Sequence, residues 1–167
     1  MQRQDSPQRS QSAAFTHTER ARGTALVGPL VALGVAAAFV AVILLATESW
    51  ATWIALAAIL LLGAWYAWGA RIAVTVDDES VRLRAPLYSR EIPLSALSSV
   101  IVAPDDGMNP GSLNWPAVPV REGATRLIRL NLGGGAAVTC RTQDGSGVQL
   151  VVRDLAAAER IADTLRR

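Results

Sequence analysis

The sequence predicts a membrane α-helical hairpin of two transmembrane helices, followed by a small β-rich domain of about seven strands closed by a C-terminal helix. Three observations predict this fold class. Two long segments, 24–47 and 50–70, contain no charged residue. Residues 71–152 alternate repeatedly between apolar and polar side chains, as strands with one buried face do. The last segment, 154–165, carries apolar residues at helical spacing.

The N-terminal segment, residues 1–23, is dominated by Gln, Ser, Arg and Thr. It has no hydrophobic periodicity, and such a composition is typical of disorder. We therefore expect a disordered cytoplasmic tail over residues 1–23. The only histidine, His17, lies in this tail. Without structured neighbours, it is not expected to act as a ligand or a base.

The hairpin is predicted over residues 24–70. At 1.5 Å per residue, each charge-free segment spans about 30 Å, the thickness of a bilayer's hydrocarbon core. Only residues 48–49 separate the two segments, so the helices must be antiparallel. Arg20 and Arg22 precede the hairpin and Arg71 follows it, whereas the turn has no arginine. By the positive-inside rule we expect a multi-pass protein of the inner (plasma) membrane with both termini in the cytoplasm.

Small residues four positions apart let helices approach closely. The hairpin contains three such pairs: Gly34 and Ala38, Ala51 and Ala55, and Gly63 and Ala67. They predict packing within the hairpin or, as the alternative, a homodimer. Neither segment contains an ionisable side chain, which argues against a transporter or a channel.

A cytoplasmic domain is expected over residues 71–167. Its first strands are predicted at 72–76 and 81–84 around an acidic turn, because apolar and polar residues alternate there. The further strands are expected near 88–91, 97–103, 128–132, 138–141 and 148–152. The glycine-rich runs 133–135 and 144–147 are expected to be hairpin turns.

The segment 104–124 is rich in Asp, Asn, Gly and Pro, which predicts a long loop. The terminal helix is expected to begin at Asp154 as its N-cap. Its apolar stripe would consist of Leu155, Ala158, Ile161 and Leu165. A helix after so many short strands favours a small barrel, or a pair of orthogonal sheets, closed at one end.

The run 92–100 (IPLSALSSV) and the strand-to-helix passage 148–165 resemble bacterial pleckstrin-homology-like (PH-like) domains of small membrane proteins. The loop that contains Trp115 is also similar to loops in that group. The resemblance covers residues 24–167. It implies a membrane-linked module, and it implies no catalytic residue.

No motif for catalysis, a cofactor or a metal is found, so we expect no enzyme, no cofactor and no metal ligands. The single Cys140 lies in an alternating run and is expected in the core. The glycine run 133–135 lacks the Lys-Ser/Thr of a phosphate loop. Residues 71–167 contain 12 arginines and 11 acidic residues, a net charge of only +1, which argues against nucleic acid as a partner.

Two sites are nevertheless proposed from the sequence. Arg71, Arg82 and Arg84 are expected to face lipid headgroups, with dispersed surface charge as the alternative. Asn109 and Trp115 are expected in a loop that contacts a protein partner. The predicted function is a membrane-tethered interaction module that binds a protein partner or the inner leaflet of the lipid bilayer. The alternative is an accessory subunit that packs through its helices beside a larger membrane complex.

Overall fold

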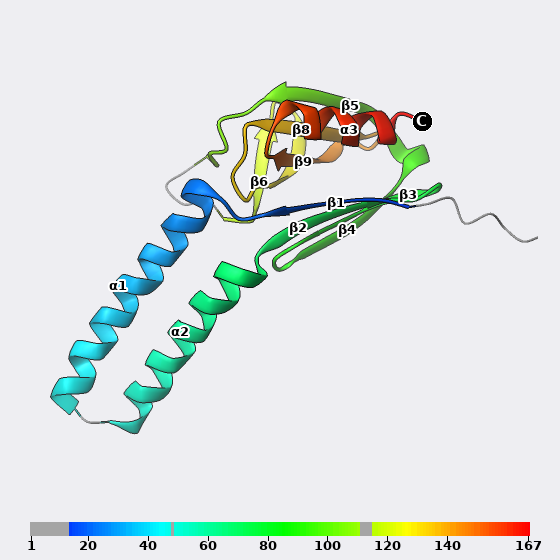
Figure 1. Ribbon diagram of the computed structural model, residues 1–167. Helices are drawn as coiled ribbons and strands as arrows, with labels where there is room; N and C mark the ends of the chain where they lie inside the picture. The colour runs from blue at the N-terminus through cyan, green and yellow to red at the C-terminus, as the bar shows by residue number, and fades with distance from the viewer. Residues whose placement is uncertain (1–13, 48, 111–114) are drawn as a thin grey trace, which may run out of the picture.

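The computed structural model describes residues 14–47, 49–110 and 115–167. Figure 1 shows a β-rich domain from which a pair of helices projects. The helices are α1 (Gly23–Thr47) and α2 (Trp50–Gly69), and they agree with the predicted segments to within one residue at each end. By length and composition, both are apolar enough to cross a membrane. We call residues 23–69 the apolar hairpin.

Large apolar side chains along both helices are left exposed by the rest of the described chain. Val31, Phe39 and Leu61 are each more than half exposed. A hydrogen bond links the two helices at the end near the domain: the buried hydroxyl of Tyr66 donates to the backbone oxygen of Ala25 over 2.8 Å. So much exposed apolar surface needs an apolar environment from outside the chain.

The small residues of the hairpin lie on two different faces. Gly63 faces α1, because a side-chain carbon placed there would lie 3.8 Å from Leu33. No described residue lies within 4 Å of the corresponding position at Gly34, and Ala38 is exposed. Packing within the hairpin therefore explains only Gly63, and a homodimer through Gly34 and Ala38 stays a prediction.

The first sheet contains β1 (Phe15–Arg20), β2 (Arg71–Val76), β3 (Ser80–Ala85) and β4 (Tyr88–Pro93), all antiparallel and in that spatial order. The predicted hairpin of β2 and β3 is confirmed. Its turn forms because the carboxylate of Asp77 accepts hydrogen bonds from the backbone N–H groups of Glu79 and Ser80. One face of the sheet is buried and the other is exposed.

The expected disordered tail is wrong for residues 15–20, which form β1. Each of its six residues is paired with a residue of β2, from Phe15 with Val76 to Arg20 with Arg71. The apolar hairpin is thus inserted between two neighbouring strands of one sheet (Figure 1). Hence the predicted domain 71–167 lacks one of its strands. Residues 1–13 lie outside the described part of the chain.

The second sheet contains β5 (Leu97–Pro104), β6 (Ala117–Glu122), β7 (Thr125–Leu130), β8 (Ala136–Thr142) and β9 (Ser146–Val152). The spatial order is β5-β8-β9-β7-β6, and a 3-10 turn, η1 (Leu94–Ala96), leads into it. Since β6 lies within 104–124, the prediction of a continuous loop there is wrong. Strand β6 was missed because its sequence, AVPVRE, contains a proline and pairs only at the edge of the sheet.

The glycine run 133–135 is not a hairpin turn, because β7 pairs with β9 in parallel and not with β8. The run instead carries the chain past the end of β9. A side chain at Gly133, whose φ is +87°, would collide with the backbone oxygen of Arg22. One at Gly134 would collide with the backbone oxygen of Val152. Glycine therefore permits a close crossing of three backbone segments.

The core lies between the inner faces of the two sheets and is closed by α3 (Leu155–Leu165). Asp154 caps this helix as predicted, since its carboxylate accepts a 2.8 Å hydrogen bond from the backbone N–H of Ala157. Ala158, Ile161 and Leu165 are buried as predicted, but the prediction is wrong for Leu155, which is 45% exposed. Two mostly antiparallel sheets with a C-terminal helix are confirmed. The described residues hold nine strands because β1 and β6 join the seven predicted.

Candidate functional site

Three arginines meet where the apolar hairpin joins the first sheet. Arg20 and Arg71 are directly opposite each other in β1 and β2, and Arg84 lies on the same outer face of β3. All three are exposed, and none makes an ion pair with another described residue. Like charges directly opposite each other in a sheet are destabilising. We call these residues the basic corner, and its charge favours an anion.

A pocket of about 330 Å³ opens at the basic corner. Arg71 and Arg84 line it together with Trp65 and Gly69 from the last turns of α2. Two guanidinium groups therefore lie beside an indole ring at the end of an apolar helix. Guanidinium groups bind phosphate through paired hydrogen bonds, and Trp is favoured where apolar and polar surroundings meet.

Arg82, the third predicted headgroup-facing residue, is on the same face but lies outside the basic corner. It forms an ion pair with Glu91 of β4, in which Nε and Oε2 are 3.1 Å apart. This neighbour offsets its charge. The structure thus brings together Arg71 and Arg84 and separates Arg82 from them.

Sequence reasoning missed Arg20 because it placed this residue in a disordered tail. The available signal was the alternation of Phe15 and His17 with Thr16 and Thr18, which is short and mostly polar. His17 does have structured neighbours, contrary to expectation. Its Nε2 lies 2.9 Å from Oε1 of Glu19, on the inner face of β1.

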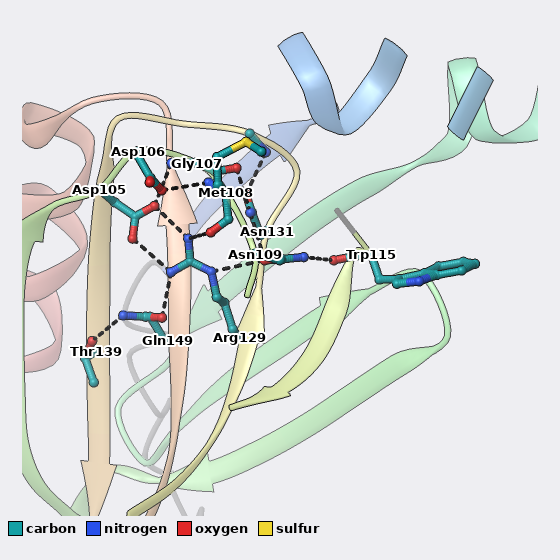
Figure 2. Close-up of polar contacts among 11 residues, drawn as sticks. Asp105, Asp106, Gly107, Met108, Asn109, Trp115, Arg129, Asn131, Thr139 and Gln149 are labelled. Carbon is teal, nitrogen blue, oxygen red and sulfur yellow. Dashed lines mark hydrogen bonds and ion pairs between the residues drawn. The ribbon is translucent and has the colours of Figure 1, made fainter. Parts of the chain in front are cut away.

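The second predicted site, the loop with Asn109 and Trp115, is held by a buried polar network that we call the polar clamp (Figure 2). At its centre, the guanidinium of Arg129 donates five hydrogen bonds of 2.7 to 3.1 Å. The acceptors are the side chains of Asp105, Asn109 and Gln149 and the backbone oxygen of Met108. All five guanidinium N–H donors are thereby satisfied. The clamp fixes the loop and leaves Arg129 no donor for a ligand.

Asn109 belongs to this clamp and is 5% exposed. Its amide donates to the backbone oxygen of Trp115, and its side-chain oxygen accepts from Asn131. Asn109 therefore positions the loop and does not present itself to a partner. Trp115 is 61% exposed, and Figure 2 shows its ring pointing away from the clamp. Residues 111–114 lie outside the described part of the chain.

Several carboxylates of the domain are favoured in their ionised form by the contacts that they make in the folded state, so their ionisation stabilises the fold. Burial alone would raise the pKa of Asp105, but hydrogen bonds from Arg129 and from the backbone of Gly107, together with the Arg129 charge, lower it. Hydrogen bonds from Thr142 and Ser146 lower the pKa of Asp144 to about 2. The backbone N–H of Ala157 lowers the pKa of Asp154.

We expect acid to destabilise the domain in a defined range. A carboxyl whose pKa is depressed by folding contributes its full stability above the unfolded value of about 3.9 and loses it as the pH falls through the folded value. The thermal unfolding midpoint of the full chain in detergent should be nearly constant from pH 7 to about 5, and should fall between about pH 4 and pH 2. A midpoint that drops mainly between pH 7 and pH 5 would contradict this assignment.

The remaining candidate for reactivity, Cys140, is buried in the core as predicted, and burial raises the pKa of its thiol to about 12. It is therefore a protonated core side chain at neutral pH. Within residues 14–47, 49–110 and 115–167, no three His, Cys, Asp or Glu side chains gather in a way that could hold a metal ion. No protein-family model, curated protein or solved structure matches this chain.

Proposed function

We propose that this protein is a membrane-anchored module: the apolar hairpin spans the inner (plasma) membrane and the domain rests on the cytoplasmic leaflet. The basic corner would face the anionic headgroups there, and the surface around Trp115 would contact a protein partner. The observation that carries the proposal is the position of Arg20, Arg71 and Arg84, without ion-pair partners among the described residues, at the base of the hairpin.

The connectivity supports a domain on one side of the membrane. Strand β1 enters the apolar hairpin and β2 leaves it, and the two strands are neighbours in one sheet. Both ends of the hairpin therefore lie at the domain (Figure 1). The arginines that flank it, Arg20, Arg22 and Arg71, are all at this end. By the positive-inside rule, this end belongs in the cytoplasm.

The turn between β3 and β4 gives independent support. Its Leu87 is fully exposed and has a left-handed φ of +60°. That conformation costs a residue other than glycine about 1–3 kcal/mol. An apolar side chain in a strained turn, fully open to solvent, is explained if the leaflet covers it. Leu87 shares a cavity lining with Pro29 and Trp65 of the hairpin, which places this turn beside the helices.

The electrostatic attraction is weak for a free domain but sufficient for a tethered one. Each arginine near an anionic leaflet gains about 1 kcal/mol. Three of them give about 3 kcal/mol, which corresponds to millimolar affinity or worse. The hairpin supplies a high effective concentration, so this energy fixes the orientation of the domain.

The test measures how close the outer face of the first sheet comes to the headgroups. Ser89, exposed on β4 opposite Arg84, is replaced by Cys and labelled with a fluorophore in the full chain. The native Cys140 is buried and protonated, so labelling is selective. In nanodiscs that contain phosphatidylglycerol and a headgroup spin-label quencher, we expect strong quenching at about 0.01 M salt. Quenching should weaken at about 1 M salt, where the Debye length falls to about 3 Å.

The variant Arg71→Gln/Arg84→Gln should lose most of the salt-dependent quenching. The matched control, Arg160→Gln/Arg167→Gln, removes two exposed arginines from α3 and the C-terminus, which lie on the side of the domain away from the hairpin (Figure 1), and should behave like the parent. Equal quenching in both double variants would refute the proposed orientation. The alternative, an accessory subunit of a larger complex, is favoured only by the outward face of Gly34. Loss of a co-purified partner with Gly34→Leu, but not with Trp115→Ala, would support it.

A further inference from the structure

A second cavity lies between the apolar hairpin and the domain, and we call it the interface cavity. Its volume is about 610 Å³. The walls come from both helices, from the β3–β4 turn, from the segment that leads into β6, and from β6 and β7. They include Pro29, Leu33, Trp65, Leu87, Trp115 and Ile128. None of the lining side chains is charged, so the cavity suits an apolar occupant.

The interface cavity adjoins the pocket at the basic corner. Trp65 and Pro86 line both of them. An elongated molecule that passes Trp65 and Pro86 would reach from the apolar interface cavity to the guanidinium groups of Arg71 and Arg84. Its chemistry must change along its length from apolar to anionic.

We propose that the two pockets together hold one anionic glycerophospholipid of the surrounding leaflet. Its phosphate would lie at Arg71 and Arg84, and one acyl chain would occupy the interface cavity. The inference rests on the proposed function, because it takes the apolar hairpin to lie in the membrane. It goes beyond a diffuse attraction to headgroups, since it assigns a discrete, saturable site.

Three observations favour a phospholipid as the occupant. The charge is complementary, because Arg71 and Arg84 have no ion-pair partner among the described residues. Residues of α1 and α2 form part of the walls, so the cavity is at the depth of acyl chains close to the headgroups. Its volume falls within the range of about 300–1,000 Å³ that ligand sites occupy.

The test uses Trp115, the one tryptophan outside the hairpin, as a reporter in the cavity wall. The three tryptophans that line neither pocket, Trp50, Trp53 and Trp68, are replaced by Phe, Trp65 is kept because it lines both pockets, and the full chain is kept in a neutral detergent. Phosphatidylglycerol with a brominated acyl chain is then titrated in as quencher. We expect quenching of the emission from Trp115 and Trp65 that saturates at one lipid per chain. Brominated diacylglycerol lacks the phosphate that the two arginines attract, so it should bind roughly 30-fold more weakly. That ratio corresponds to about 2 kcal/mol, or about 1 kcal/mol for each arginine.

The cavity itself is probed by Ala32→Phe, which adds a ring to the cavity wall from an exposed position on α1. This variant should bind the brominated lipid at least tenfold more weakly. The matched control, Ala58→Phe, is exposed on α2 and does not line the cavity, so it should leave binding unchanged. Native mass spectrometry of the natural sequence provides a second count of bound phosphatidylglycerol and does not depend on the tryptophan replacements.

Each contrary result overturns a defined part of the proposal. Lipid binding that is unchanged in Ala32→Phe would exclude the interface cavity. Equal binding of diacylglycerol would exclude the role of Arg71 and Arg84. A dimer that forms without lipid and is lost in Ala32→Phe would mean that a second copy of the chain fills the cavity. If lipid binding is unchanged in Ala32→Phe and the Ser89 label is also never quenched in anionic nanodiscs, the proposed function has failed as well. Normal quenching of that label would confine the failure to the discrete site.

Discussion

A chain in which Asn-Gly replaces residues 22–69 is expected to fold as a soluble protein, whereas the fragment 71–167 is expected to aggregate. The difference is β1. Its six residues pair with all six residues of β2, and the backbone N–H of Ala21 donates to the oxygen of Ala70 beyond the last pair. A two-residue Asn-Gly turn is the usual connection between such neighbours. Without β1, strand β2 becomes an exposed edge that carries Ile72, Val74 and Val76.

The side chain of Glu19 adds a contact between β1 and the far end of the chain. Its carboxylate accepts a 3.2 Å hydrogen bond from the backbone N–H of Arg153, 134 residues away, just before α3. Size-exclusion chromatography and thermal circular dichroism compare the two proteins. We expect a monomer with a cooperative transition for the Asn-Gly variant only. A monomeric fragment 71–167 with the same melting temperature would show that β1 adds nothing to stability.

The variant Asp105→Ala is expected to lower the free energy of unfolding by about 3–5 kcal/mol, because it leaves the buried guanidinium of Arg129 without its carboxylate. The side chains of Arg129 and Asp105 are only 6% and 12% exposed, and their closest N–O distance is 2.7 Å. The effect should be measured by chemical unfolding of the full chain in detergent. The loop that carries Trp115 should also loosen, since the clamp fixes it through Asn109. The emission of Trp115 should then change before global unfolding.

The exposed pair Arg82–Glu91 is the matched control. Its side chains are both 53% exposed, so Glu91→Ala should cost at most about 1 kcal/mol. The double variant Arg129→Met/Asp105→Ala should recover part of the loss, because it removes the unpaired charge as well. If Asp105→Ala costs no more than Glu91→Ala, the polar clamp does not hold the loop.

The clamp also illustrates why loop residues resist assignment from sequence. Asn109 and Trp115 were predicted together as partner-facing because both lie in a segment rich in Asp, Gly and Pro. Arg129 comes from β7, 20 residues further on, and its side chain determines that Asn109 points inward. Trp115 alone stays exposed. The same composition therefore contains one structural residue and one surface residue, and only the fold distinguishes them.

Local periodicity was enough to predict the two apolar helices, the strands β2–β5 and β7–β9, and the capped helix α3. Each of these elements shows its buried face within a few residues of chain, since helices and strands repeat every 3.6 and 2 residues. Burial of Cys140 and exposure of Arg82 and Arg84 followed from the same alternation. The sequence alone therefore determined which side chains of most elements face the core.

Only the tertiary structure decided the role of residues 15–20, the parallel pairing of β7 with β9, the basic corner and the interface cavity. Strand β1 is short and polar, and it is a strand because β2 lies beside it after an insertion of two helices. Arg20 and Arg71 are 51 positions apart in the chain and directly opposite in the sheet. A local sequence pattern indicates which side chains of one segment face the core and which face solvent. It carries no signal for contacts between distant segments, and both proposed sites are made of such contacts.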